Sequence, residues 1–330
     1  MSTLRSVCLR ACSLLAVALL SACAGGSMQP PPPGGFAPAA RRAGMQTLQP
    51  LRSWVNPEAK TQKLLYISDL TDQVVSMYSY PGGKLEGQIT GFFNPEGLCV
   101  DHVGNVWVTN DTSDGVHQIT EYAHGGTTPI ANLLDPDGRT NGCSINPVNG
   151  DLAVTNFFGA TGQGSVSIYK KAQGSPIEYI DLDLYYYYYC GYDAKGDLFV
   201  DGWSSGSNFA FAELPRGGKK LKTVVLNHSI TYPGGVQWDG KHVAVGDQYG
   251  PIYQFDIQGN VGTEVGSTPL NGEKQIVQFW IQGRYVVGPN EYGANVMLWN
   301  YPAGGSVVKT LSGPGQGATV SRVPPSAPPV

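Results

Sequence analysis

The sequence predicts an all-β protein, a six-bladed β-propeller with four strands in each blade. Three observations support this fold class. The chain has 330 residues, of which 44 are glycine and only 14% are charged, a composition typical of turn-rich sheet proteins. A strand pattern recurs six times at nearly constant spacing. A segment close to the C-terminus matches a strand that the first repeat lacks.

The repeat is clearest at residues 104–110, where Gly-Asn-Val-Trp-Val-Thr-Asn alternates apolar and polar positions. Residues 64–69 form a copy without the leading glycine. The other copies begin at glycines separated by 46, 46, 44 and 43 residues, namely Gly104, Gly150, Gly196, Gly240 and Gly283. Periods of this length, with alternating β-branched and aromatic residues, are typical of propeller blades.

The remaining strands of each blade follow from the same alternation. A second alternating strand is expected at residues 74–80, 116–122, 165–171, 209–215, 252–257 and 296–301. Glycine pairs end several of these strands, because tight hairpin turns need residues that tolerate positive φ. One preceding and one following strand, as at residues 97–101 and 84–90, bring each blade to four. Two β-sandwiches in tandem are the alternative, but they do not explain six matched periods.

The two ends of the repeat region complement each other. The first unit has no inner strand, whereas residues 317–321 match residues 97–101 and have no blade of their own. We therefore predict that the C-terminus, at about 317–323, supplies the inner strand of the first blade. This closure would leave no unpaired inner edge.

The first 22 residues predict a secretory leader. They contain Arg5 and Arg10, no acidic residue, and an apolar run at 14–20 that is too short to span a bilayer. The following Leu20-Ser21-Ala22-Cys23 resembles a bacterial lipobox. That resemblance implies cleavage before Cys23, lipidation of this cysteine and a membrane anchor. An ordinary signal peptide is the alternative.

The expected domain order is a lipoprotein signal peptide at 1–22, a lipidated cysteine with a Pro/Gly-rich tether at 23–47, the propeller at 48–323, and a disordered proline-rich tail at 324–330. Ala24 after the cysteine favours, by resemblance, the outer membrane of a bacterial cell envelope. The formal charge of −4 and pI near 5.7 exclude nucleic acid as an expected partner. We expect a monomer.

Residues 104–110 and 150–156, with Pro95-Glu96-Gly97-Leu98 before them, resemble NHL and YVTN-type propeller repeats and the gluconolactonase (senescence-marker-protein) superfamily. The resemblance covers roughly residues 60–323. It implies the fold but no single activity, because propellers of this kind include lactonases, lyases and binding platforms.

Candidate site residues lie where strands meet the predicted channel mouth. The start of an inner strand and the end of a second strand share one face of a blade, which places Glu96, Asn141, Asp69, Asn110, Asn156 and Asp247 around that opening. Carboxylate and amide oxygens suit Ca²⁺ or Mg²⁺. The gluconolactonase resemblance implies one such ion held by Glu, Asn and Asp, with Glu96 and Asn141 as candidates. Alternatively, these side chains cap β-turns.

The sequence thus supports two functions. The first is a non-catalytic binding scaffold that presents one propeller face to a protein, glycan or small molecule. The alternative is a divalent-metal-dependent lactonase or related hydrolase with Glu96 as ligand or base. Residues 202–206 match the G-x-S-x-G string of hydrolases, but an alternating strand follows instead of a helix. Residues 135–141 resemble a calcium loop faintly and are interpreted as a turn.

Three cysteines remain after the leader and Cys23 are set aside. Cys143 and Cys190 both align with Leu98 on inner strands of neighbouring blades, so a Cys143–Cys190 disulfide is expected if their Cα atoms lie within about 7 Å. Packing as small apolar residues is the alternative for all three, Cys99 included. The tyrosine run at 185–189 predicts either packing between blades or stacking rings at the channel mouth.

Overall fold

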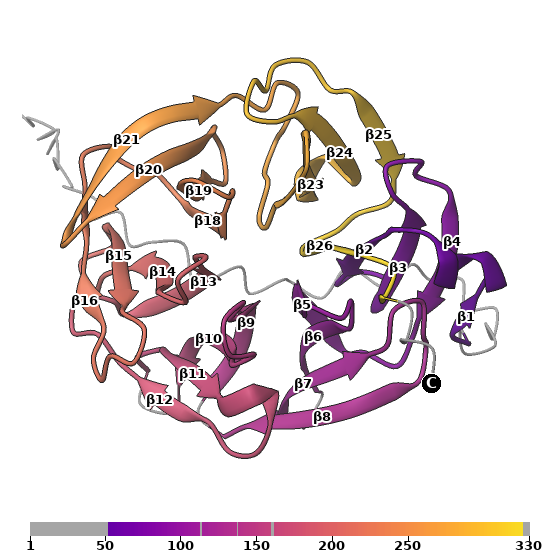
Figure 1. Cartoon of the computed structure of the whole chain (residues 1–330), viewed down its shortest axis with the longest axis horizontal. Helices are drawn as coiled ribbons and strands as arrows, with labels where there is room; N and C mark the ends of the chain where they lie inside the picture. Colours follow the sequence, from indigo (N-terminus) through magenta and orange to yellow (C-terminus); the bar gives the residue numbers. More distant parts are fainter. Residues whose placement is uncertain (1–51, 113, 137, 160–161, 326–330) are drawn as a thin grey trace, which may run out of the picture. The chain divides into compact units, whose positions relative to one another are not determined.

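The computed structural model describes residues 52–112, 114–136, 138–159 and 162–325, all within one compact unit. The strands of these residues form six sheets, antiparallel except for the pair of β17 with β21, arranged as blades around a central axis (Figure 1). Helical structure in the described ranges is limited to three short 3₁₀ turns, η1 (Pro57–Thr61), η2 (Lys170–Ala172) and η3 (Glu291–Gly293). The predicted all-β, six-bladed propeller is therefore confirmed.

Four blades consist of four consecutive strands that run from the channel to the outer edge. Blade 2 contains β5 (Asn94–Val100), β6 (Val106–Asp111), β7 (His117–Tyr122) and β8 (Pro129–Asp135); blade 3 contains β9 (Gly138–Ile145), β10 (Leu152–Gly159), β11 (Ser165–Tyr169) and β12 (Ile177–Tyr179). Blade 4 contains β13 (Tyr186–Tyr192), β14 (Leu198–Trp203), β15 (Phe209–Leu214) and β16 (Lys222–Thr223); blade 6 contains β22 (Trp280–Gln282), β23 (Tyr285–Asn290), β24 (Asn295–Asn300) and β25 (Lys309–Ser312).

The other two blades each gain a short fifth strand at the outer edge. Blade 1 runs outward through β26 (Ala318–Ser321), β2 (Leu64–Asp69), β3 (Val74–Ser79), β4 (Leu85–Ile89) and β1 (Trp54–Val55). Blade 5 runs through β18 (Pro233–Trp238), β19 (Val243–Asp247), β20 (Ile252–Gln258), β21 (Val261–Thr268) and β17 (Val225–Leu226). In both cases the extra strand comes from a connecting segment that the repeat pattern did not predict as a strand.

The ring closes as the sequence predicts. β26 pairs with β2, with Val320 opposite Leu65 and Thr319 opposite Tyr66. The same strand also completes a hydrophobic cluster with blade 6, where Val320 packs with Val287. Because each strand face buries apolar side chains against the next blade, a wheel whose ends did not meet would expose two such faces.

Six hydrophobic clusters fill the six interfaces between neighbouring blades. The interface of blades 2 and 3 is typical: Trp107 and Tyr169 are fully or almost fully buried there, beside the apolar residues of β9 and β10. Alternating residues of each strand supply opposite interfaces, so the period of two in the sequence follows directly from blade packing.

The structure corrects the expected cysteine pairing. Cys143 is bonded to Cys99, with 5.6 Å between their Cα atoms, and Cys190 is a buried free thiol. Cys143 and Cys190 do occupy equivalent positions, but equivalent residues of neighbouring blades point the same way around the ring and do not meet. Leu98 is the residue of blade 2 that is equivalent to Cys143. Cys99 is one residue further along the strand, so its side chain points to the opposite face of the sheet from that of Leu98. Cys99 and Cys143 consequently face each other between blades 2 and 3.

Several predicted segments lie outside the described residues. These are the leader at 1–22, the lipidation site Cys23, the tether at 23–47, and residues 326–330 of the tail. In the described ranges, no helix is long and apolar enough to cross a membrane.

Candidate binding site at the channel mouth

The channel mouth is formed where the inner strands begin. In blades 2 to 5 these strands carry a β-bulge, so that two residues oppose one residue of the second strand. The register places the first residue of each pair, and the equivalent residues of blades 1 and 6, at the rim of the mouth. From blade 1 to blade 6 these rim residues are Gln316, Glu96, Asn141, Tyr188, Gly234 and Val277. Glu96 and Asn141 thus lie at equivalent positions of adjacent blades, as the repeat register predicts.

Two large side chains fill the channel just below this rim. The residue that follows the rim residue is glycine in four blades, but it is Tyr189 in blade 4 and Gln278 in blade 6. The Gln278 side chain crosses to blade 2, where its amide bonds the N–H and the carbonyl of Leu98, both at 3.2 Å. Glycine is required opposite it, because a Cβ on Gly317 would clash with the backbone carbonyl of Glu96 and would also crowd the Gln278 amide. Gln278 therefore joins blade 6 to blade 2 below the rim.

A network of charged side chains lies at the channel mouth. The Arg139 guanidinium contacts the Glu96 carboxylate and, through Nε, the Asp111 Oδ2 atom at 3.2 Å. His117 Nδ1 lies 2.7 Å from Asp111 Oδ1, and Asn94 donates a hydrogen bond of 2.8 Å to Glu96. The Glu96 side chain is only 12% exposed, so this pairing compensates much of the cost of burying its charge.

Burial and neighbouring charges shift the titration of the network. Burial is the main cause that raises the pKa of Glu96, although Arg139 opposes it. Burial, with a smaller contribution from Glu96, raises the pKa of Glu291 in blade 6 to about 7. The hydrogen bond with Asp111 raises the pKa of His117. The mouth therefore changes its net charge near neutral pH.

The other predicted site residues make hydrogen bonds to neighbouring groups of the protein. Asp69 accepts the N–H groups of the turn that follows it. Asn110 accepts two N–H groups of the segment entering β5, both at 3.0 Å, and Asp247 does the same before β18, at 2.6 and 3.2 Å. The contacts of these three residues agree with the turn-capping interpretation that the sequence left as the alternative. Asn156 instead donates to side chains, those of Asp135 and two serines of β11.

The residues at the mouth do not fit a divalent cation held by Glu96 and Asn141. The guanidinium of Arg139 places a positive charge in contact with the carboxylate that would bind the ion. Asn141 uses its amide nitrogen to bond the carbonyl of Tyr188 at 2.6 Å. In the described ranges no group of three His, Cys, Asp or Glu residues is arranged to hold a metal. We derive no chemistry through such an ion.

Aromatic rings lie beside the same opening on blades 3 to 5. Phe157 stacks on Tyr186 with centroids 5.0 Å apart and meets Tyr188 edge-to-face, also at 5.0 Å. Tyr232 continues the series by contacting Tyr188 at 6.2 Å and Tyr249 at 5.5 Å. The tyrosine run therefore packs between blades: Tyr187 is buried between blades 3 and 4, and Tyr188, which also lies at the rim by register, is buried in the cluster between blades 4 and 5.

Sequence reasoning missed Arg139, Asp111 and His117, and it placed Glu291 at the mouth only with uncertain register. Arg139 lies in the segment interpreted as a turn, two residues before Asn141, and becomes part of the site only through the extension of β9 to Gly138. The other three lie at or next to ends of second and third strands, where polar residues usually cap turns. The repeat register was the available signal, because it places these strand ends on the same face as Glu96.

A second set of hydrogen bonds holds the channel wall together below the rim. The hydroxyl of Thr109 accepts the N–H of Gly97 at 2.8 Å and donates to the carbonyl of Asn141 in the next blade at 2.6 Å. Thr155 in blade 3 and Ser68 in blade 1 make the equivalent pair of bonds. These hydroxyls connect neighbouring inner strands.

Asp201 takes this position in blade 4. Its Oδ1 accepts the N–H of Tyr189 at 2.8 Å, while its fully buried Oδ2 has no hydrogen-bond partner of standard geometry in the described residues. Complete burial raises the pKa of Asp201 well above its usual value. A protonated carboxyl group can donate where the threonines donate, so we expect the neutral form in the folded protein.

Asp201→Asn is expected to stabilise the protein at pH 8, by on the order of 2 kcal/mol, and to change little at pH 4. Folding raises the pKa of Asp201. The contribution of its carboxyl group to wild-type stability is therefore fully present below the pKa of Asp201 in the unfolded chain, and it is lost as pH rises toward the pKa in the folded protein. An amide does not titrate. Urea unfolding from pH 4 to pH 8 measures the difference, with exposed Asp72→Asn as control; parallel pH profiles of wild type and Asp201→Asn would refute the expectation.

Arg139→Met is expected to lower the free energy of unfolding by about 3 kcal/mol at pH 7, because the carboxylates of Glu96 and Asp111 lose their cation. The loss should shrink toward pH 4, where Glu96 becomes neutral. Adding Glu96→Gln to the same chain should recover part of the stability. Urea unfolding of the single and double variants at both pH values tests this; equal losses at pH 4 and pH 7 would contradict it.

Comparison with known proteins bears on the fold. No protein-family model matches the chain, and a search of curated proteins finds no match. A chain of the nidogen/laminin complex matches with a TM-score of 0.65 at 12% identity, covering 79% of this chain and 99% of that one. A protein of unknown function from Bacteroides caccae gives a TM-score of 0.59 with the same identity and coverage. These likenesses show a shared propeller fold; the NHL, YVTN and gluconolactonase resemblance stays a prediction.

Proposed function

We propose that this protein is an envelope-anchored binding scaffold that docks a partner protein through the channel-mouth face of its propeller. The observation that carries the proposal is the combination, on one face, of a charged network with exposed aromatic rings. The rings lie at strand ends and turns of blades 2, 3, 5 and 6: Phe93, Phe158, Tyr249 and Tyr292 are 49%, 39%, 47% and 65% exposed. Aromatic side chains of this kind are typical anchors of protein interfaces.

The charge of the mouth favours a basic group on the partner. Glu96, Asp111 and Glu291 contribute three carboxylates against the guanidinium of Arg139 and the imidazole of His117, and no ion pair in the described residues involves Glu291. A lysine or arginine of the partner would find in Glu291 a carboxylate that lacks a cation. Because the pKa of Glu291 is about 7, binding is expected to strengthen as pH rises through that value.

A similar propeller occurs in a protein–protein complex, that of nidogen and laminin, which is consistent with a scaffold. The structure offers no comparable support for the hydrolase alternative, because Arg139 occupies the carboxylate that would act as metal ligand or base.

Site-specific photocrosslinking in cells tests the docking face. A photoreactive residue at Phe93, Phe158 or Tyr292 should give one common crosslinked protein, whereas one at exposed Val148, in a loop at the opposite ends of the strands, should not. Tyr249→Ala should weaken the interaction by roughly tenfold or more. Equal crosslinking from Val148, crosslinks only to glycan, or no crosslink from the mouth would refute the proposal.

The anchor is tested separately. Wild-type protein should fractionate with membranes and carry lipid on the N-terminal peptide that begins at Cys23, as detected by mass spectrometry. Cys23→Ala should release the chain into the soluble envelope fraction. If both proteins fractionate alike and Cys23 carries no lipid, the anchoring part of the proposal fails while the docking face remains testable.

A further inference from the structure

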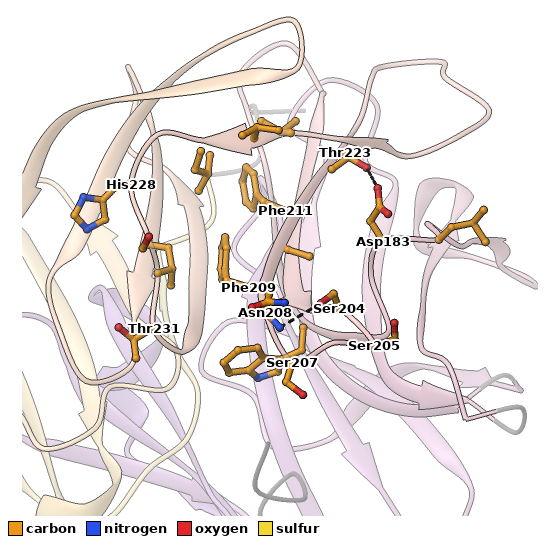
Figure 2. Close-up of a pocket in the computed structure, with 18 residues that line it drawn as sticks. Asp183, Ser204, Ser205, Ser207, Asn208, Phe209, Phe211, Thr223, His228 and Thr231 are labelled. Atoms are coloured by element: carbon orange, nitrogen blue, oxygen red, sulfur yellow. Dashed lines mark hydrogen bonds between the residues drawn. The ribbon is translucent and has the colours of Figure 1, made fainter. Parts of the chain in front are cut away.

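A second cleft lies between the outer parts of blades 4 and 5; its lining includes Trp203, whose ring meets Tyr232 at 5.2 Å. It encloses about 710 Å³. Figure 2 shows the rings of Phe209 and Phe211 between His228 and Thr231 on one side and the hydrogen-bonded pair of Asp183 and Thr223 on the other. The neighbouring Leu182 and Val225, at the rim of this cleft, are 93% and 61% exposed. Apolar side chains thus line both the cleft and its entrance.

The edge of the sheet is open inside this cleft. β14 pairs with β15 along its whole length, from Phe209 to Leu214. On the other side, β16 pairs only with Ala212 and Glu213, and the N–H of Val224 adds one bond to the carbonyl of Phe211. In the described residues, no strand pairs with Phe209 on that side, although β17 passes close to β15 on its way to β21. By the alternation of an antiparallel strand, the N–H and carbonyl of Phe209 and the N–H of Phe211 face outward.

The edge is open because the chain leaves blade 4 early. Val224 is buried in the cluster between blades 4 and 5, and it draws the following residues across the interface. Leu226, which would have continued β16 opposite Phe209, instead lies opposite Gly262 in β21 as part of β17. The fourth strand of blade 4 is therefore shortened, and blade 5 gains a fifth.

The same molecule shows what fits such an edge. Trp54 and Val55 form β1, which adds to the outer edge of blade 1 in antiparallel register. Val225 and Leu226 form β17, which adds to blade 5. In both cases a two-residue extended segment with apolar side chains completes the sheet.

We propose that the open edge of β15 is a second binding site, which takes an extended segment of a partner protein as an added strand antiparallel to β15. The backbone of that segment would bond Phe209 and Phe211, completing the ladder that β16 begins. One row of its side chains would pack on Ile230 and Leu226 in the cleft. The occupant is uncharged and apolar, since the charged groups of the lining are engaged: Asp183 bonds Thr223, and His228 pairs with Glu264 at 2.9 Å.

A peptide probe tests this site on the full chain. The probe is a fluorescent peptide of eight residues in which valine alternates with threonine, flanked by lysines for solubility. Fluorescence anisotropy should show binding, and hydrogen exchange should slow at the amides of Phe209 and Phe211. The same peptide with N-methyl groups on its valines should bind about tenfold or more weakly, because it loses backbone hydrogen bonds but keeps its side chains.

Matched variants separate the edge from the apolar surface. Phe209→Pro removes the outward N–H and should weaken probe binding about tenfold, whereas Phe209→Leu keeps the N–H and should bind within about threefold of wild type. Val225→Asp should also weaken binding, while Ile130→Asp, an exposed apolar position on blade 2, should not.

Unfolding midpoints establish that each variant is folded. Equal binding of the N-methylated probe, or equal binding by Phe209→Pro and Phe209→Leu, would overturn the proposal. So would a concentration-dependent dimer in sedimentation velocity that Phe209→Pro abolishes, because the edge would then belong to a second copy of this chain.

Discussion

A chain that ends at Pro314 is expected to lose its cooperative unfolding transition. It lacks β26, whose four residues, Ala318 to Ser321, are at most 1% exposed. It also loses the pairing of β26 with β2 and the apolar contacts of Val320 with blade 6. The combined loss is comparable with the total stability of a domain, about 5–15 kcal/mol. Urea unfolding followed by circular dichroism, with size-exclusion chromatography, measures the effect.

A chain that ends at Pro325 is the matched control and should unfold like the full chain. Val320→Asp should reproduce much of the defect by burying an unpaired charge, whereas Val323→Asp, at a 44% exposed position, should be tolerated. A synthetic peptide of residues 315–325 should restore part of the transition when added to the shortened chain. An unchanged midpoint in the chain ending at Pro314 would show that β26 does not close the ring.

Cys99→Ser is expected to lower the free energy of unfolding by roughly 4 kcal/mol under oxidising conditions. The disulfide with Cys143 joins residues 44 positions apart, and in the chain-entropy account closing a loop of that length restricts the unfolded chain by about this amount. Cys143→Ser should give a similar loss, because either change removes the same bond. Urea unfolding with and without reductant measures both.

Cys190→Ala distinguishes this pairing from the one expected from sequence. Its side chain is a buried free thiol, so the variant should lose only about 1 kcal/mol for a small cavity, and its stability should still depend on reductant. Peptide mapping without reduction should recover the Cys99–Cys143 bridge. A large loss in Cys190→Ala with little loss in Cys99→Ser would restore the alternative pairing.

The fold was predictable because its signals are local. Each blade repeats the same four-strand unit, so the alternation at residues 104–110 and its copies is visible without knowledge of distant contacts. The match of residues 317–321 with residues 97–101 was enough to predict closure. The shortened β16 was not predictable, because its cause is the burial of Val224 against a neighbouring blade.

The site was predictable only in part. Repeat register placed Glu96 and Asn141 at equivalent rim positions, but it did not show that Arg139 pairs with Glu96. That contact joins residues 43 positions apart on different blades. The roles of Asn110 and Asp247 were also left open, since the sequence shows a polar strand end but not which N–H groups approach it.

By itself, the sequence determined the wheel of six modules, its closure by the C-terminus and the face on which polar strand ends gather, because these follow from periodicity along one chain. Tertiary structure alone decided which neighbours those side chains meet. Successive residues of a strand point alternately to the two neighbouring blades, so a shift of one residue decides which blade a side chain meets. That one-residue shift brings Cys99 to Cys143, and the packing of neighbouring blades brings a guanidinium to Glu96.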